Sequence, residues 1–157
     1  MGTGRGWGAA FELEGREGAR TEWGVEIDGE REEFGGWSGE VQGDFFFHPG
    51  TQWEISVHPS WERGEEPRQY VMTVDDGRPE TFGQRFVFAR VDRSEVATRV
   101  RVNYTFTPNL TLETYAEPFA SSGSFSGFGE LLAPRSRGLL EYGTGGTTIA
   151  RNADGSH

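Results

Sequence analysis

The sequence predicts an all-β fold, an antiparallel meander of about eight long strands followed by a short helix or loop segment and an irregular tail. Three observations support this prediction. Apolar and polar side chains alternate, which is the period of a pleated strand, along most of residues 1–120. Clusters of Gly, Pro, Asn and Asp separate these runs and suit turns. Aromatic residues make up 13% of the chain although hydrophobic residues make up only 34%, and so many rings argue against disorder.

The first four predicted strands alternate from end to end. They cover residues 7–14, 19–28, 37–48 and 52–62. One face of each is apolar and carries tryptophan near an end, as at Trp7, Trp23 and Trp53. The other face carries mostly Glu, Asp, Gln and His. Sheets with one solvated face show this pattern.

The next four predicted strands are less uniform. They cover residues 70–74, 85–91, 96–107 and 110–119. The third of these is the clearest, because Val100, Val102 and Tyr104 alternate with Arg99 and Arg101. The polar segments 29–36, 63–68 and 75–83 are predicted to be loops, and residues 92–94 a tight turn.

Two hairpins allow a register to be predicted, because like faces must meet across a strand pair. At the turn around Pro108, Tyr104 is expected opposite Leu112 and Asn103 opposite Glu113. At the turn around Gly50, the expected partners are Phe47 with Trp53, Phe45 with Ile55 and Gln42 with His58.

The domain division predicted from this pattern is residues 1–120 as barrel strands and residues 121–157 as a loop or short-helix segment and tail. Residues 121–132 are not strand-like, and Pro134 would stop a helix there. Their Phe125 and Phe128 are expected to dock on the end of the barrel or to enter its lumen. Residues 152–155 (Asn-Ala-Asp-Gly) are predicted to form a turn.

Strand length and aromatic placement favour a transmembrane β-barrel over a soluble sheet. Predicted strands of roughly 10–13 residues match the about 9–11 residues that a tilted membrane strand needs, whereas soluble strands average about 5–6 residues. Trp and Tyr near strand ends resemble the aromatic girdles of such barrels. The charged face then suits a wet lumen. A soluble antiparallel β-domain that binds a ligand or a protein partner gives the same alternation and remains the alternative.

The acidic residues are concentrated in the first half of the chain, and this limits the classes of partner that it can bind. Residues 1–66 carry 15 acidic and 5 basic groups, a balance of −10, whereas residues 67–157 carry 10 of each. So acidic a half argues against nucleic acid as a partner, because phosphates need a basic surface. The chain has no Cys, which excludes disulfides and thiolate metal sites. No cofactor or metal is expected.

Residues 82–92, 99–119, 123–131 and 140–143 carry a family resemblance, most specifically in the string Asn103-Tyr-Thr-Phe-Thr-Pro-Asn109. They resemble the C-terminal part of bacterial proteins of domain-of-unknown-function family 5916. The resemblance implies an outer-membrane β-barrel, in proteins that often carry an N-terminal sugar-binding-like module related to carbohydrate-binding family 9. Neither that module nor a signal peptide is recognisable, and we expect an internal fragment of a larger barrel, embedded in the bacterial outer membrane.

The candidate site residues are four side chains of the charged face that differ from its many carboxylates. Phe46 and Tyr115 are aromatic where polar residues are expected, and His58 and Arg99 are polar groups of the same face. These four are the candidates for binding a small-molecule or glycan ligand in the lumen.

No catalytic motif is found, so the chain is interpreted as leaning toward a non-enzymatic transport or surface-binding role. A barrel hydrolase that uses lumen carboxylates is the remaining alternative, with Glu12 and Glu22 expected to face each other across the first hairpin.

Overall fold

Eight strands and one 3-10 turn make up the computed structural model, which describes residues 5–16, 18–33, 35–134, 136 and 138–147. The elements are β1 (Gly6–Glu14), β2 (Thr21–Glu32), β3 (Trp37–Phe47), β4 (Trp53–Asp75), η1 (Pro79–Thr81), β5 (Gln84–Thr107), β6 (Leu110–Ala116), β7 (Phe119–Leu131) and β8 (Leu139–Glu141). None of the described residues belongs to a helix that is long and apolar enough to cross a membrane.

The strands form one sheet in the order β1-β2-β3-β4-β5-β7-β8, and β6 also pairs with β5. The pairs β1–β2, β2–β3, β3–β4, β5–β6 and β7–β8 are antiparallel. The predicted antiparallel meander of eight strands is therefore confirmed. Within the described residues the strand order ends at β1 on one side and β8 on the other, so this sheet is open. Closure into a barrel and insertion into a membrane stay predictions.

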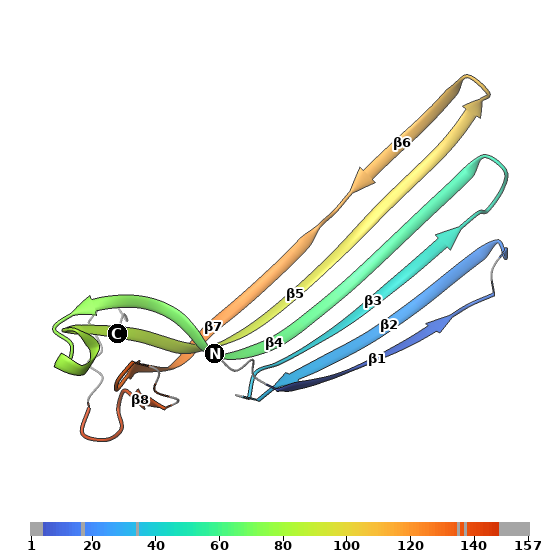
Figure 1. Ribbon diagram of the computed structural model, residues 1–157. Helices are drawn as coiled ribbons and strands as arrows, with labels where there is room; N and C mark the ends of the chain where they lie inside the picture. Colours follow the sequence, from blue (N-terminus) through green and yellow to red (C-terminus); the bar gives the residue numbers. More distant parts are fainter. Residues whose placement is uncertain (1–4, 17, 34, 135, 137, 148–157) are drawn as a thin grey trace. The chain divides into compact units, whose positions relative to one another are not determined.

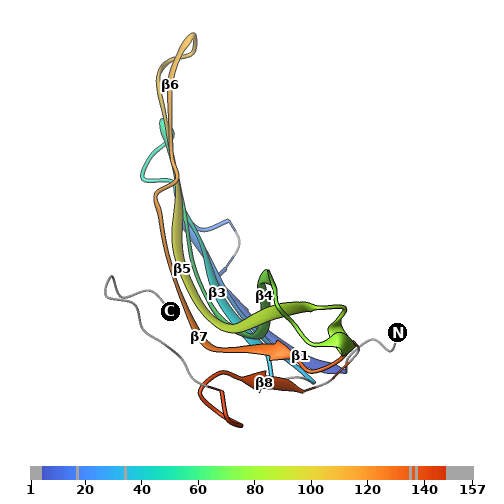
Figure 2. The ribbon, with the colours of Figure 1, turned by 90° about the vertical axis from the view of Figure 1, so that its left-hand side faces the viewer.

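The chain divides into two units. Unit 1 comprises Met1–Glu65 and Arg93–Gly123, and unit 2 comprises Glu66–Asp92 and Ser124–His157. In unit 1 the strands β1 to β3 and the adjoining parts of β4 and β5 lie side by side, with β6 folded back along β5 (Figure 1). Seen nearly edge-on in Figure 2, β3 and the unit 1 part of β5 lie in one layer.

The register of unit 1 keeps like side chains on one face. Trp7 and Trp37 both pair with Arg31, and Ile27 lies between Phe11 and Val41. We call the resulting surfaces of unit 1 the apolar face and the polar face. The apolar face includes Trp7, Phe11, Leu13, Trp23, Val25, Ile27, Trp37, Val41, Phe45, Phe47, Trp53, Ile55, Val57 and Trp61. The polar face includes Glu12, Glu26, Asp28, Glu30, Glu40, Asp44, Phe46, Ser56 and Glu62.

The apolar face is uncovered. Trp7 is 67% exposed, Phe11 61% and Ile27 47%. The buried hydrophobic side chains among the described residues are Val87 and Ala89, which both belong to unit 2. Within its described part, unit 1 therefore has no core between two layers, and the large apolar side chains of this face stay exposed.

Unit 2 contains a tight turn between β4 and β5. Thr81 is buried, and its hydroxyl donates to the carbonyl of Gln84 at 2.5 Å. The amide of Gly83 donates to the carbonyl of Arg78 at 2.9 Å. Between them Phe82 adopts a left-handed backbone with φ of 58° while its side chain is 85% exposed. A bulky residue in this region is strained, and the hydrogen bonds around it hold the strain in place.

Two predicted breaks do not exist. Residues 63–68 lie inside β4, a strand of 23 residues, and residues 92–94 lie inside β5, a strand of 24 residues. Arg63 and Glu65 pair with Gly39 and Trp37 of β3. Because backbone hydrogen bonds to β3 hold these residues in the strand, their polar side chains do not end it. The polarity of residues 63–68 therefore did not indicate a loop.

The loop or short helix predicted for residues 121–132 is also wrong. Residues up to Leu131 continue β7, which neighbours β5 and pairs with β8 through Gly129 and Glu141. Its small residues give no clear period, so pairing with neighbouring strands decides its conformation. Residues 139–141 of the predicted tail form β8. The turn predicted at residues 152–155 falls outside the described residues.

The register of one predicted hairpin is confirmed and the other is shifted. Tyr104 pairs with Leu112 and Asn103 with Glu113, followed by a bulge before Thr107. Around Gly50 every pair is displaced by two residues, so that Phe47 meets Ile55, Phe45 meets Val57 and Gln42 meets Ser60. A shift of two leaves every side chain on its predicted face, and alternation cannot distinguish the two registers.

Candidate ligand-binding site

The polar face of unit 1 contains a hollow of about 350 Å³ built by three neighbouring strands. Its lining comprises Phe46 of β3, Glu54, Ser56 and His58 of β4, and Arg99, Arg101 and Asn103 of β5. Within each strand these residues are two apart, because alternate side chains point to one face. The hollow is therefore a direct product of strand period and register.

One side of the hollow is aromatic and rigid. Phe46 pairs with Ser56, which is buried. The Phe46 and His58 rings meet edge to face with centroids 5.3 Å apart. The Nδ1 atom of His58 lies 2.5 Å from Oδ1 of Asp44, a hydrogen bond that fixes the orientation of the imidazole. This wall is preorganised, since the two rings contact each other and Asp44, outside the hollow, holds the imidazole.

The other side of the hollow is cationic. The Nη2 atom of Arg99 lies 3.5 Å from Oε1 of Glu117, and the Arg99 side chain stays 50% exposed. The guanidinium carbon of Arg101 lies 5.4 Å from the centre of the Tyr115 ring. The Tyr115 hydroxyl donates in turn to Glu117. Two guanidinium groups from residues two apart on one strand are thus held beside the hollow.

Three of the four predicted site residues come together. Phe46, His58 and Arg99 line the hollow, whereas Tyr115 does not line it and acts through its contact with Arg101. Glu54, Ser56, Arg101 and Asn103 also line the hollow and were not predicted as site residues. The alternation that placed His58 and Arg99 on the polar face also places these four there, so the signal was present. The register between β4 and β5 was needed to bring them together.

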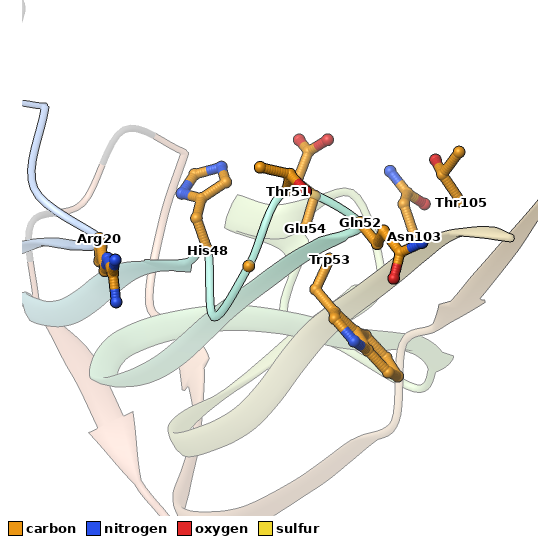
Figure 3. Close-up of a pocket in the computed structure, with 9 residues that line it drawn as sticks. Arg20, His48, Thr51, Gln52, Trp53, Glu54, Asn103 and Thr105 are labelled. Atoms are coloured by element: carbon orange, nitrogen blue, oxygen red, sulfur yellow. The ribbon is translucent and has the colours of Figure 1, made fainter. Parts of the chain in front are cut away.

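A second hollow, of about 420 Å³, adjoins the first at the turn between β3 and β4 (Figure 3). Glu54 and Asn103 line both hollows. In Figure 3 the Glu54, Asn103 and Thr105 side chains point to one side of the ribbon, and Trp53 points to the other. The Trp53 ring instead lies 4.4 Å from the ring of Tyr104, centroid to centroid. The two hollows are therefore contiguous.

The predicted pairing of Glu12 with Glu22 is wrong. Glu12 faces Glu26, and Glu22 faces Phe46. The turn between β1 and β2 is longer than assumed, and the Gly18 amide donates to the Glu22 carboxylate at 2.8 Å. Among the described residues no three His, Cys, Asp or Glu side chains are placed to hold a metal ion. The carboxylates of this face are arranged as rows across strands, as in Asp28, Glu40 and Glu62.

Unit 2 carries a separate polar cluster around Glu130, which is buried. Its carboxylate lies 3.7 Å from Arg78 and 3.8 Å from Arg85, and it accepts a hydrogen bond from the Tyr142 hydroxyl at 3.2 Å. Burial, together with the negative charge of Glu130, raises the pKa of Tyr142. The cluster links β7 to the η1 turn and to the residue after β8, which indicates a structural role.

Comparison with known proteins adds no relative: no family model, no curated protein and no solved structure matches the chain.

Proposed function

We propose that the chain is part of a β-barrel that crosses the bacterial outer membrane, with the apolar face of unit 1 toward lipid and its polar face toward the lumen. Its role is then transport or surface binding of a small, carbohydrate-type ligand. The observation that carries the proposal is the exposed apolar face of unit 1, which has tryptophans toward both ends of its strands and no charged described residue between them.

Tryptophans on three strands mark one end of this face: Trp7, Trp37 and Trp61. Trp7 and Trp37 are in register, since both pair with Arg31. On β4, Glu65 is the partner of Trp37, and Trp61 lies four residues from it.

Tryptophans mark the other end as well. Trp23 pairs with Phe45, which pairs with Val57. Trp53 lies four residues from Val57, toward the start of β4. Rings near both ends of the strands resemble the aromatic girdles of outer-membrane barrels.

Charged residues of the apolar face lie at one of these ends. Arg31 is level with Trp7 and Trp37, and Arg63 and Glu65 lie beyond Trp61 on β4. No described residue of β1 to β4 on this face is charged between the tryptophans of the two ends. Trp53 and Trp61 are eight residues apart, about 26 Å along the strand and about 19–22 Å along the membrane normal at a barrel tilt of about 35–45°. The rings at both ends extend this strip toward the about 25 Å apolar band of outer-membrane barrels.

Detergent dependence tests the proposal. The 157-residue chain is refolded in detergent micelles or lipid vesicles and, in parallel, in buffer alone. We expect monodisperse material with a β-sheet circular-dichroism spectrum only with detergent or lipid, and quenching of tryptophan fluorescence by brominated lipids. A monomeric chain with the same spectrum in buffer alone would overturn the membrane assignment and favour the soluble β-domain.

A further inference from the structure

We propose that the hollow between Phe46, His58, Arg99 and Arg101 binds a sugar that carries a carboxylate, a uronic acid. The inference deepens the proposed function by naming its ligand class, and it rests on that function for placing the hollow in a lumen. The binding itself depends only on residues of unit 1.

Two arginines lie close together at this place on an otherwise acidic face. The polar face of β1 to β3 is acidic, with Glu12, Glu26, Asp28, Glu30, Glu40 and Asp44. The hollow lies beside this surface, where β5 brings in Arg99 and Arg101. The third arginine of this part of β5, Arg93, lies outside the hollow and pairs with Glu62. An anion that enters this face therefore meets its two closely spaced cations at the hollow.

The two arginines keep capacity for a ligand. The 3.5 Å separation of Arg99 from Glu117 is longer than the about 2.7–2.9 Å of a strong charge-assisted hydrogen bond. Arg101 contacts the ring of Tyr115, which orients a guanidinium without using its N–H groups. A planar carboxylate matches the fork of donors on a guanidinium and binds it in a bidentate way.

The rest of the lining suits a sugar ring better than a simple anion. Phe46 gives an apolar wall for the C–H groups of a pyranose. Asn103, Ser56 and His58 supply amide, hydroxyl and imidazole groups for its hydroxyls. Glu54 accepts hydrogen bonds from hydroxyls and repels a doubly charged phosphate. The second hollow, which shares Glu54 and Asn103, gives space for a further sugar unit (Figure 3).

The test is a titration of the refolded full chain with galacturonate, and with galactose as the neutral sugar of the same shape. Binding is followed by the NMR shifts of the arginine Nε–H groups. We expect a dissociation constant of about 1 mM for galacturonate and binding at least about tenfold weaker for galactose. The double variant R99Q/R101Q should bind galacturonate about ten- to a hundredfold more weakly. The matched control R93Q removes an arginine of the same strand and face and should stay within about twofold.

Several results would overturn the proposal. The first two are absence of galacturonate binding and an affinity for galactose equal to that for galacturonate. The others are a loss of galacturonate affinity in R93Q as large as in R99Q/R101Q, and displacement of galacturonate by an equal concentration of inorganic phosphate. If R99Q/R101Q does not fold, R99K/R101K keeps the charges while removing the forks, and unchanged affinity would then reject bidentate recognition. If the chain proves soluble without detergent, the same titration is carried out in buffer. Failure of the membrane proposal therefore does not prevent the test of galacturonate binding.

Discussion

Replacing Ile27 by lysine separates a lipid-facing sheet from a soluble one. Ile27 lies four residues from Trp23 and four from Arg31 on β2, midway across the apolar strip. It is 47% exposed, so nothing in the described chain needs to move to admit a lysine.

The expected magnitude depends on the solvent of the apolar face. A lysine at the midplane of a bilayer costs about 2–4 kcal/mol on the lipid face of a barrel, which lowers the folding equilibrium constant about 30- to 900-fold. In water the same exposed substitution changes stability by no more than about 0.5 kcal/mol. The predicted loss of about 2–4 kcal/mol is therefore specific to lipid.

The assay is reversible urea unfolding of the chain in lipid vesicles, followed by tryptophan fluorescence. Gln42→Lys is the matched control. Gln42 pairs with Glu26 on the polar face, and its replacement by lysine adds one positive charge, as the replacement of Ile27 does. We expect it to be neutral or slightly stabilising because it lies beside a carboxylate. An Ile27→Lys variant no less stable than Gln42→Lys would refute the assignment of the apolar face to lipid.

Three further predictions concern unit 2. Phe82→Asn should stabilise the turn by about 0.5–1 kcal/mol, because asparagine tolerates the left-handed backbone and removal of the exposed ring costs no packing. The measurement is hydrogen exchange at the Gly83 amide, which should become slower. Phe82→Ala keeps the backbone strain and should leave this exchange rate unchanged. Glu130→Gln should destabilise the unit by about 1–2 kcal/mol in urea, and an unchanged midpoint would show that the cluster is not structural. The raised pKa of Tyr142 means that its contribution to stability is complete below its ordinary value of 10.0 and is lost as pH rises through the folded-state value. Tyrosinate absorbance should therefore show one late-titrating tyrosine that disappears in Tyr142→Phe, and ionisation together with the other tyrosines would contradict the burial.

Part of the candidate site was open to prediction from the sequence. Phe46, His58 and Arg99 were recognisable because each occupies the polar face of an alternating strand, and a strand's period fixes the face of every residue. Their proximity was not predictable, because side-chain alternation determines the face on which a residue lies but not the residue that it pairs with on the next strand. Glu12 illustrates this limit: its partner is Glu26, not Glu22, and both partners satisfy the same alternation.

The sequence by itself determined that this chain makes long antiparallel strands with one apolar and one charged face, because side-chain alternation depends only on local backbone geometry. Only the tertiary structure decided where β4 and β5 continue through charged residues such as Arg63 and Asp92, and where β7 extends through a run of small residues. In those segments the backbone hydrogen bonds to neighbouring strands outweigh local preference. The same pairing set Trp7 level with Trp37 and gathered Phe46, His58 and Arg99 around one hollow, since register is a property of strand pairs and not of any single strand.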